Sequence, residues 1–152
     1  MKKHAVILGV LLAVVVVILY LIATGALHPA YADEYTEDDL YELSHVIAGE
    51  ANDSSKIMKQ YVGSVVLNRV ADERFPNTVY EVVHQQGQYS CTWDGNFSKE
   101  PNEETLEVAK DLLENGSIID ASVVWQAEFR QGSGVYDILT CPVMGTQMYF
   151  CY

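Results

Sequence analysis

The chain has 152 residues, a mass of 17.0 kDa and a formal charge of −12 at pH 7, with a sequence pI near 4.5. Its length predicts one globular domain. Its acidity argues against nucleic-acid binding, because contacts with phosphates need a clustered positive surface. With 49% hydrophobic and 20% charged residues, the composition is typical of a folded rather than a disordered protein.

The first expected element is an uncharged run over Ala5–Leu27, which is 23 residues long. A helix of that length crosses the roughly 30 Å hydrocarbon core of a bilayer. Lys2 and Lys3 are the only charged residues before Asp33, so residues 33–152 carry a formal charge of −14. Because positive residues flank the cytoplasmic end of a membrane helix, this distribution places the N-terminus in the cytoplasm and residues 33–152 outside. The small-x-small site Ala30–Ala32 leaves a cleaved secretory signal open. The run exceeds the roughly 7–15 residues of a signal core, which favours an uncleaved membrane anchor.

All three cysteines, Cys91, Cys141 and Cys151, follow this segment and therefore lie in a compartment that permits disulfides. Because three is an odd number, at least one thiol stays free or pairs between chains. A bond between Cys141 and Cys151 would close a short loop. The spacing does not fit a zinc site, and we expect no metal and no cofactor.

Helix signals dominate the next part of the chain. Caps and apolar spacing predict four helices: one capped by Thr36 and ending at Ala51, one capped by Ser54 or Ser55, a short one over Thr78–His84, and one capped by Asn102 and ending at Asn115-Gly116. The stretch Gln85–Phe97 is expected to be loop with some strand. Ser122–Phe129 and Val143–Cys151 are β-prone, with a flexible turn at residues 132–134. Helices followed by a few short strands predict an α+β fold.

Glu50 is the strongest candidate for a catalytic residue in the sequence. It follows Leu43 by seven positions and Ile47 by three, so it projects from the apolar stripe of the first of these helices, near its C-terminal end. Burial and the negative end of the helix dipole both raise the pKa of such a carboxyl, as a general acid requires. The alternative is a structural carboxylate at the helix end, paired with Arg69 or Lys56.

Four ordered motifs lie within residues 45–95. They are His45–Ala51 (HVIAGEA), Val62–Val70 (VGSVVLNRV), Arg74–Val79 (RFPNTV) and Gly87–Ser90 (GQYS). Together they resemble the cell-wall hydrolase family of the spore cortex-lytic enzymes (SleB type), and the spacing from Glu50 to Asn68 is kept without a gap.

The resemblance, which thins after Gly95, implies a small lysozyme-like domain similar to lytic transglycosylases. We assign this domain to residues 33–152, because the apolar run and the small-x-small site already assign residues 1–32 to an anchor or signal segment. The resemblance also implies cleavage of peptidoglycan glycan strands between N-acetylmuramic acid and N-acetylglucosamine, with Glu50 as the catalytic acid. Gln88 and Ser90 match the loop beside the family's catalytic site.

The chain also departs from the family pattern. Ser54 stands where the family often has a second glutamate, and Gln147 stands where a histidine is often found. The missing glutamate favours a lytic transglycosylase that uses one carboxylate. A muramidase with two carboxylates and a non-catalytic glycan-binding protein remain the alternatives, and Asp94 and Glu128 are the candidate second acids.

Further substrate contacts are expected from aromatic residues, because a sugar ring has an apolar face that stacks on an aromatic ring. The candidates are Trp93 and Trp125, with Tyr89 and Tyr149. Trp93 is favoured because it lies in a polar loop, whereas Trp125 is at least as consistent with a core position. Asn68 and Arg69 are expected to satisfy buried backbone groups or to brace the Glu50 helix rather than to touch substrate.

Overall fold

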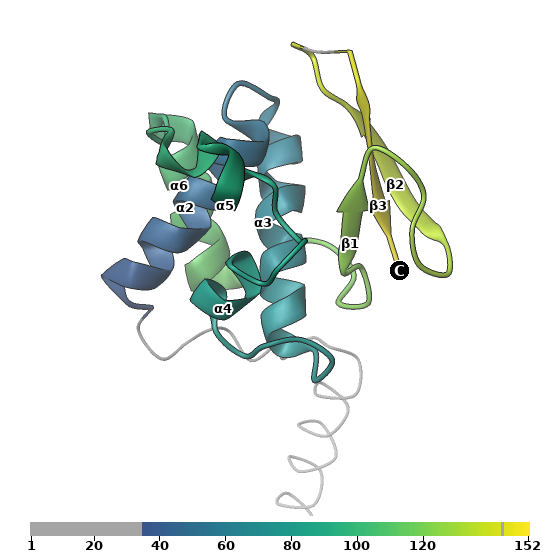
Figure 1. Ribbon diagram of the computed structural model, residues 1–152, viewed down its shortest axis with the longest axis horizontal. Coiled ribbons are helices and arrows are strands. Elements are labelled where there is room, and N and C mark those ends of the chain that lie inside the picture. Colours follow the sequence, from purple (N-terminus) through teal and green to yellow (C-terminus); the bar gives the residue numbers. More distant parts are fainter. Residues whose placement is uncertain (1–34, 144) are drawn as a thin grey trace, which may run out of the picture. The chain divides into compact units, whose positions relative to one another are not determined.

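The computed structural model describes residues 35–143 and 145–152, and the elements below belong to this part of the chain. Five α-helices and one 3₁₀ turn come first, and a three-stranded sheet follows (Figure 1). The elements are α2 (Glu37–Ala51), α3 (Lys56–Ala71), α4 (Val79–Val83), α5 (Cys91–Asp94), η1 (Asn96–Ser98), α6 (Glu103–Asn115), β1 (Trp125–Ala127), β2 (Val135–Thr140) and β3 (Gln147–Cys151). The α+β expectation is confirmed. The expected membrane segment lies outside the described residues, and within them no helix is long and apolar enough to span a bilayer.

The four expected helices are present with the caps that their sequences indicate. Thr36 caps α2 through a reciprocal capping box with Asp39. Ser55, rather than Ser54, caps α3, and Thr78 caps α4. Asn102 caps α6, and the chain leaves that helix at Gly116, which has a positive φ of 86°.

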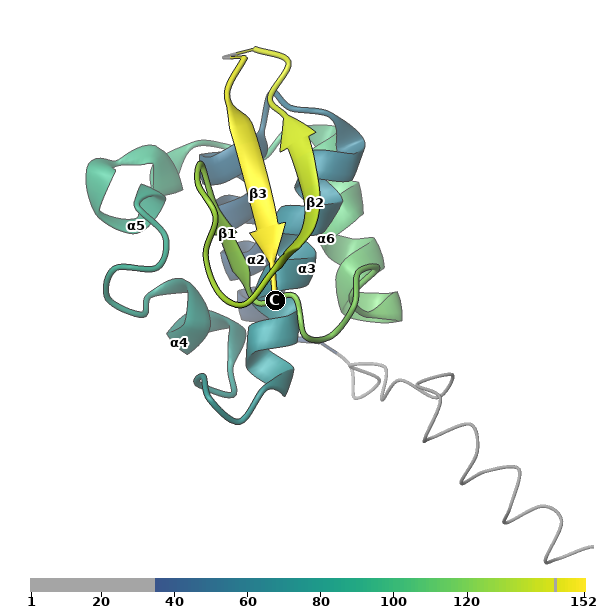
Figure 2. The ribbon, with the colours of Figure 1, turned by 90° about the vertical axis from the view of Figure 1, so that its right-hand side faces the viewer.

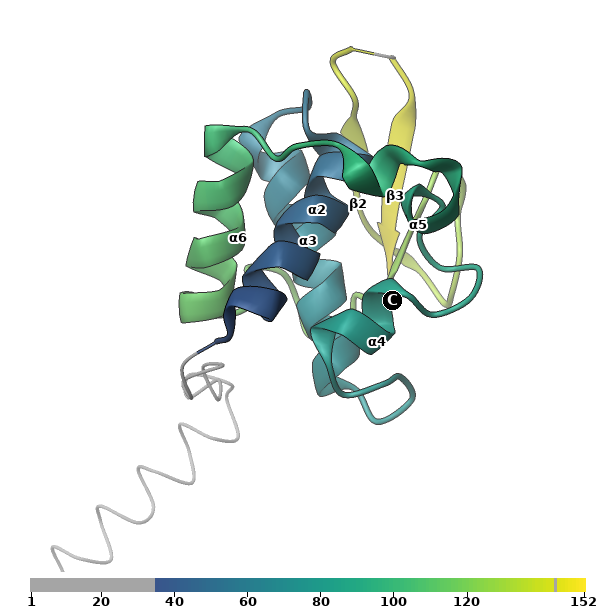
Figure 3. The ribbon, with the colours of Figure 1, turned by 60° about the vertical axis from the view of Figure 1, so that its left-hand side comes forward.

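Helices α2, α3 and α6 form the core layer, and α6 lies along both of the others (Figure 3). A Cβ at Gly63 would lie 2.5 Å from a terminal methyl group of Leu112 and 2.8 Å from that of Ile47, so the glycine lets these core side chains pack close to the α3 backbone. The core residues that are fully shielded from solvent include Leu43, Val46, Ile47, Val62, Val65, Val66, Ala109 and Leu113.

The sheet has the strand order β1-β3-β2, and both pairs are antiparallel. It lies beside α3 (Figure 2), where the ring of Tyr61 packs edge-on against Phe150 with centroids 5.0 Å apart. The Tyr61 hydroxyl donates to Asp137 at 3.2 Å. These contacts attach the sheet to the helical layer.

Two expectations for the second half of the chain were wrong. Gln85–Phe97 contains the short helix α5 and the start of η1 rather than any strand. Strand β2 was not expected, because Asp137 interrupts the apolar residues of its sequence. In the folded sheet the pairing of β2 with β3 has a register irregularity between Val135 and Asp137.

A disulfide between Cys141 and Cys151 does not fit this hairpin. The Cys141 N–H donates to the Thr146 carbonyl at 2.8 Å, whereas Cys151 lies opposite Val135 at the other end of β3. Five strand residues span roughly 16 Å at about 3.3 Å per residue. A disulfide needs Cα atoms within about 7 Å, so the two thiols are too far apart to bond.

Candidate active site

Glu50 is the second-last residue of α2, and the buried stripe of that helix places it. Leu43, Val46 and Ile47 on the same helix are 0% exposed, so α2 is held firmly against the core up to the turn that carries Glu50. Glu50 itself is half-buried. Its carboxyl therefore lies at the boundary between core and solvent.

Burial raises the pKa of Glu50 above its usual value near 4.5, and the negative charge of Asp94 raises it further. Hydrogen bonds from the thiol and the backbone N–H of Cys91 oppose the shift without cancelling it. The ion pairs of the described residues do not include Glu50. The structural alternative, a pairing with Arg69 or Lys56, is therefore absent from this site.

Cys91 opens α5 directly beside the end of α2. It is 1% exposed, and burial next to Glu50 raises the pKa of its thiol, which stays protonated and can donate. A Cβ at Gly49 would lie 2.6 Å from the Cys91 Cβ and 2.9 Å from its Sγ. Only a glycine at position 49 lets α5 approach closely enough for Cys91 to reach the Glu50 carboxyl.

Two open hollows meet at Glu50. The first, which we call the Trp93 hollow, has a volume of about 350 Å³ and is lined by Gly49, Glu50, Gly87, Gln88, Ser90, Trp93, Asp94, Asn96, Gln126, Ala127, Glu128 and Met148. The second, which we call the Lys99 hollow, has a volume of about 250 Å³ and is lined by Ala48, Gly49, Glu50, Ala51, Asn52, Asp53, Ser54, Asn96, Lys99, Cys141 and Val143. Gly49, Glu50 and Asn96 belong to both, so Glu50 has open space on two sides.

The structure brings four of the sequence-predicted residues together in the Trp93 hollow. Gln88, Ser90 and Trp93 line it with Glu50, and the Trp93 ring is 60% exposed. An exposed indole beside a carboxyl is a suitable platform for a sugar ring.

Tyr89 and Trp125 line neither hollow. Tyr89 is 1% exposed, and both rings lie over the Arg69 guanidinium, with centroids 5.2 Å (Tyr89) and 5.7 Å (Trp125) from its carbon. The Trp125 ring also meets Phe75 edge-on at 5.8 Å. In this structure the two side chains belong to an aromatic cluster behind the cleft.

Asn68 and Arg69 hold the segment that leads into β1. Asn68 donates to the carbonyls of Asp120 at 2.8 Å and Val123 at 2.9 Å, and Arg69 Nε donates to the Val124 carbonyl at 2.7 Å. These bonds confirm that both side chains satisfy buried backbone groups. They act on the sheet wall of the cleft, since Gln126 and Glu128 lie just beyond this segment.

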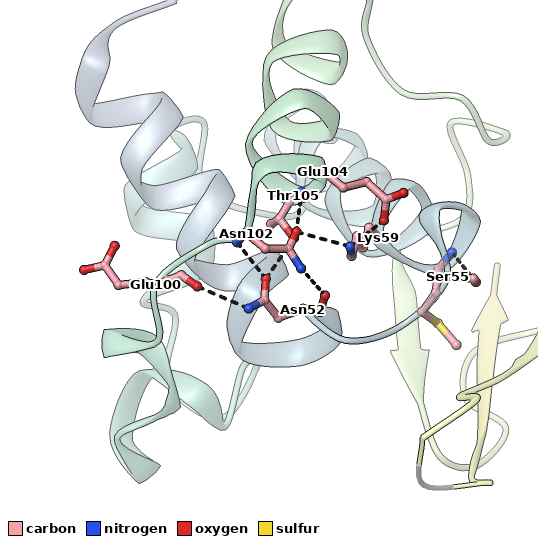
Figure 4. A network of polar contacts seen from close by, with 8 residues as sticks. Asn52, Ser55, Lys59, Glu100, Asn102, Glu104 and Thr105 are labelled. Carbon is pink, nitrogen blue, oxygen red and sulfur yellow. Dashed lines mark hydrogen bonds and ion pairs between the residues drawn. The ribbon is translucent and has the colours of Figure 1, made fainter.

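A buried polar network fixes the turn that follows Glu50 (Figure 4). Asn52 Nδ2 donates to the Glu100 carbonyl at 3.2 Å, and Asn52 Oδ1 accepts from the Asn102 N–H at 3.1 Å and from the Thr105 hydroxyl at 2.9 Å. Asn102 Nδ2 donates back to the Asn52 carbonyl at 2.7 Å. The end of α2 is thereby fastened to the start of α6.

The acids around Glu50 are mostly engaged or solvated. Asp53 Oδ2 accepts from Lys99 Nζ at 3.2 Å, and Asp94 Oδ1 accepts from the Asn96 N–H at 2.8 Å. Glu128 is exposed. Across the described residues, no group of three His, Cys, Asp or Glu side chains is arranged to hold a metal ion.

Sequence reasoning did not identify Asn96, Lys99, Gln126 or Met148 as lining residues. Asn96 and Lys99 lie in and after η1, and Gln126 and Met148 lie on paired strands. Their approach to Glu50 depends on tertiary packing and leaves no local spacing signal. Ser54, which the sequence marked as a candidate helix cap and as a departure from the family pattern, lines the Lys99 hollow beside Glu50.

Residues 53–129, half of the chain, match the Cell Wall Hydrolase family. The chain belongs to this family. The match begins three residues after Glu50, so the catalytic candidate lies just outside it.

The chain is also similar to curated spore cortex-lytic enzymes. Over 79 residues, 52% of this chain, it is 28% identical to the enzyme of Bacillus cereus, 28% to that of Oceanobacillus iheyensis and 27% to that of Bacillus subtilis. It covers only 30%, 29% and 26% of those proteins, respectively.

Two solved structures share its fold. The catalytic domain of Bacillus cereus SleB matches with a TM-score of 0.60 and 19% identity, covering 78% of this chain and 93% of that one. The catalytic domain of the germination-specific lytic transglycosylase SleB from Bacillus anthracis matches with a TM-score of 0.61 and 19% identity, covering 79% and 98%. The predicted resemblance to the SleB fold is confirmed.

Proposed function

We propose that this protein cleaves peptidoglycan glycan strands between N-acetylmuramic acid and N-acetylglucosamine, as a lytic transglycosylase with Glu50 as its acid. The observation that carries the proposal is the position of Glu50, half-buried where two hollows meet, with a pKa raised by burial. A protonated carboxyl in a cleft open on both sides can reach a bond within a strand that lies across it. The similarity to spore cortex-lytic enzymes supports the substrate class.

In the proposed reaction Glu50 donates its proton to the glycosidic oxygen as the bond to the muramic acid C1 breaks. Positive charge develops on that sugar as an oxocarbenium-like centre. The Glu50 carboxylate then accepts the proton of the same sugar's 6-hydroxyl, whose oxygen attacks C1 and closes a 1,6-anhydro ring. The carboxyl ends protonated, as it began, so no second acid is consumed.

The surroundings of Glu50 favour this route over attack by water. Ser54, at the family's second-glutamate position, lines the Lys99 hollow but cannot serve as a general base of carboxylate strength. Asp53 is paired with Lys99, and Asp94 caps a backbone N–H. An intramolecular hydroxyl already lies next to the reacting carbon, which lowers the entropic cost of attack.

A second reaction is supported by one observation. Asp94 and Glu128 line the same hollow as Glu50, so either could act as the base or nucleophile of a muramidase. Trp93 and Gln88 would also suit a protein that holds glycan without cleaving it. Product analysis separates these alternatives.

The test is mass spectrometry of peptidoglycan sacculi digested with the full-length protein. We expect products that end in 1,6-anhydro-muramic acid. We also expect Asp53→Asn, Asp94→Asn and Glu128→Gln each to keep more than about one tenth of wild-type activity, because none of them carries the transferred proton. Reducing muramic acid ends, together with an inactive Asp94 or Glu128 variant, would establish a muramidase instead. Binding without any cleavage would establish a glycan-binding protein.

A further inference from the structure

The charges of the two hollows differ. Glu50, Asp94 and Glu128 line the Trp93 hollow, and no cation is among its lining residues. Glu50, Asp53 and Lys99 line the Lys99 hollow. Lys99 is thus the only cationic residue among the described residues that line the two hollows. An anionic group on a ligand therefore meets only like charges in the Trp93 hollow and a lysine in the Lys99 hollow.

The substrate proposed above carries such groups at regular positions. Each muramic acid bears a lactyl carboxylate, which is either free or extended by a stem peptide with carboxylates of its own. The chain has a net charge of −12, so a polyanionic glycan is repelled by most of the molecule. The position of a single cation in the cleft then decides where an anionic substituent can be accepted.

Lys99 is suited to this role by its place in the fold. It ends η1 (Asn96–Ser98), where its backbone N–H donates to the Asn96 carbonyl, and Asn96 lines both hollows. The Lys99 side chain is 44% exposed and its partner Asp53 is 66% exposed. An ion pair of this exposure contributes little stability, so a ligand carboxylate can share or replace Asp53 at the ammonium group. An ammonium group offers three donors, of which Asp53 accepts one.

We propose that the Lys99 hollow is the subsite for a carboxylate-bearing substituent of the glycan, and that Lys99 Nζ binds this carboxylate while Asp53 competes for it. The inference rests on the proposed function and adds to it the orientation of the strand. The uncharged sugar lies on Trp93, and the anionic substituent lies on the opposite side of Glu50.

The experiment measures binding to the full-length protein with Glu50→Gln, which prevents turnover. Three ligands are compared by titration calorimetry at constant ionic strength: neutral chitohexaose, peptide-bearing glycan strands, and strands from which an amidase has removed the peptides to leave free lactyl carboxylates. Each is measured with and without Lys99→Gln. Lys110→Gln, on the exposed face of α6, is the matched control for the loss of one positive charge.

We expect Lys99→Gln to weaken binding of anionic strands about fivefold, the effect of losing one solvent-exposed charge contact, and to leave chitohexaose binding unchanged. Lys110→Gln should change neither, and Asp53→Asn should strengthen binding of the anionic strands. A loss confined to amidase-treated strands identifies the lactyl carboxylate, and a loss confined to peptide-bearing strands identifies the stem peptide.

Two results overturn different claims. If Lys99→Gln changes binding of anionic strands and chitohexaose equally, or changes neither, the carboxylate subsite is wrong while the glycan cleft stands. If none of the three ligands binds to the Glu50→Gln protein in which Lys99 is unchanged, the proposed function itself is contradicted.

Discussion

At the scale of single residues, the proposed activity depends on the Glu50 carboxyl, whose neighbours shift its pKa in opposite directions. Burial and Asp94 raise the pKa of Glu50, whereas the two donors of Cys91 lower it. The net shift keeps a proton on Glu50 to a higher pH than in an exposed glutamate. The hydrogen bonds from Cys91 also hold the Glu50 carboxyl in place. The same contact therefore affects both the pKa of the carboxyl and its position.

This shift predicts a pH-dependent effect of Glu50→Gln on stability. The folded state holds the Glu50 proton to a higher pH than the unfolded chain, so the free energy of unfolding falls as the pH rises from near 4.5 through the raised pKa. Glutamine does not titrate and avoids that fall. We expect wild type and Glu50→Gln to have similar melting temperatures at pH 4, and the variant to melt higher at pH 7.

Thermal unfolding followed by circular dichroism at a series of pH values measures this difference. Glu107→Gln, which removes an exposed carboxylate from α6, corrects for the general effect of one negative charge fewer. A gap between wild type and Glu50→Gln that stays constant with pH, or that matches the Glu107 control, would mean that Glu50 is not desolvated in the folded protein.

At the scale of the elements, the site depends on two contacts at the end of α2. The first is the close approach of α5, which leaves no room for a side chain at Gly49. We expect Gly49→Ala to destabilise the protein by about 1–3 kcal/mol, the range for overpacking, which outweighs the gain of about 0.5–1 kcal/mol from placing alanine in a helix. It should also lower activity, because α5 carries the donors to Glu50.

Urea unfolding and activity on sacculi together test the Gly49 prediction. Gly134→Ala is the control, since a Cβ there would meet only Tyr152 at an ordinary distance of 3.5 Å. A Gly49→Ala variant as stable and as active as the Gly134 control would show that α5 can move away at no cost.

The second contact is the Asn52 network between α2 and α6 (Figure 4). Asn52→Ala leaves the Glu100 carbonyl, the Asn102 N–H and the Thr105 hydroxyl without this partner. We expect a loss of about 1–3 kcal/mol in urea unfolding, the cost of leaving the partly buried Asn102 N–H without a partner, while the Thr105 hydroxyl keeps its bond to Asn102 Oδ1. Asn115→Ala removes an exposed hydrogen bond to Asp111 and should change stability by much less. Equal losses in the two variants would contradict the network's structural importance.

Sequence reasoning succeeded for the elements whose signals are local. The caps Thr36 and Asn102, the start of the short helix near Thr78 and the stripe that contains Glu50 follow from neighbours within one or two helical turns. Helix α5 has four residues, too few to show a helical period, and its Ser90 cap makes no side-chain hydrogen bond. Strand β2 carries an acid that pairs with Tyr61 on α3, a contact that only the folded chain reveals.

The candidate site shows the same division. Glu50, Gln88 and Ser90 were found from motifs and Trp93 from its polar loop, all within short segments, and the structure places them in one hollow. Tyr89 and Trp125 face the buried Arg69 instead, and a list of aromatic residues does not reveal which way a ring points. Lys99 reaches the cleft only because η1 packs beside α2.

At the scale of the whole molecule, an acidic domain follows an apolar N-terminal run. We propose that residues 5–27 anchor the protein in the bacterial membrane, with the catalytic domain on the extracytoplasmic side. The expectation is that most of the protein stays with the membrane fraction and resists carbonate extraction, because an uncharged run of 23 residues is long enough to span the bilayer. N-terminal sequencing that finds mature protein in the medium starting at Asp33 would establish a cleaved signal instead.

The proposed cleavage of glycan depends on Glu50 acting as the acid. Its most direct test is the rate of dye release from labelled sacculi by full-length wild type and Glu50→Gln, with circular dichroism of both proteins to confirm an intact fold. We expect Glu50→Gln to fold and to lose at least about 100-fold in rate, the scale of general-acid catalysis. A folded Glu50→Gln protein that releases dye at a rate near that of wild type would contradict it.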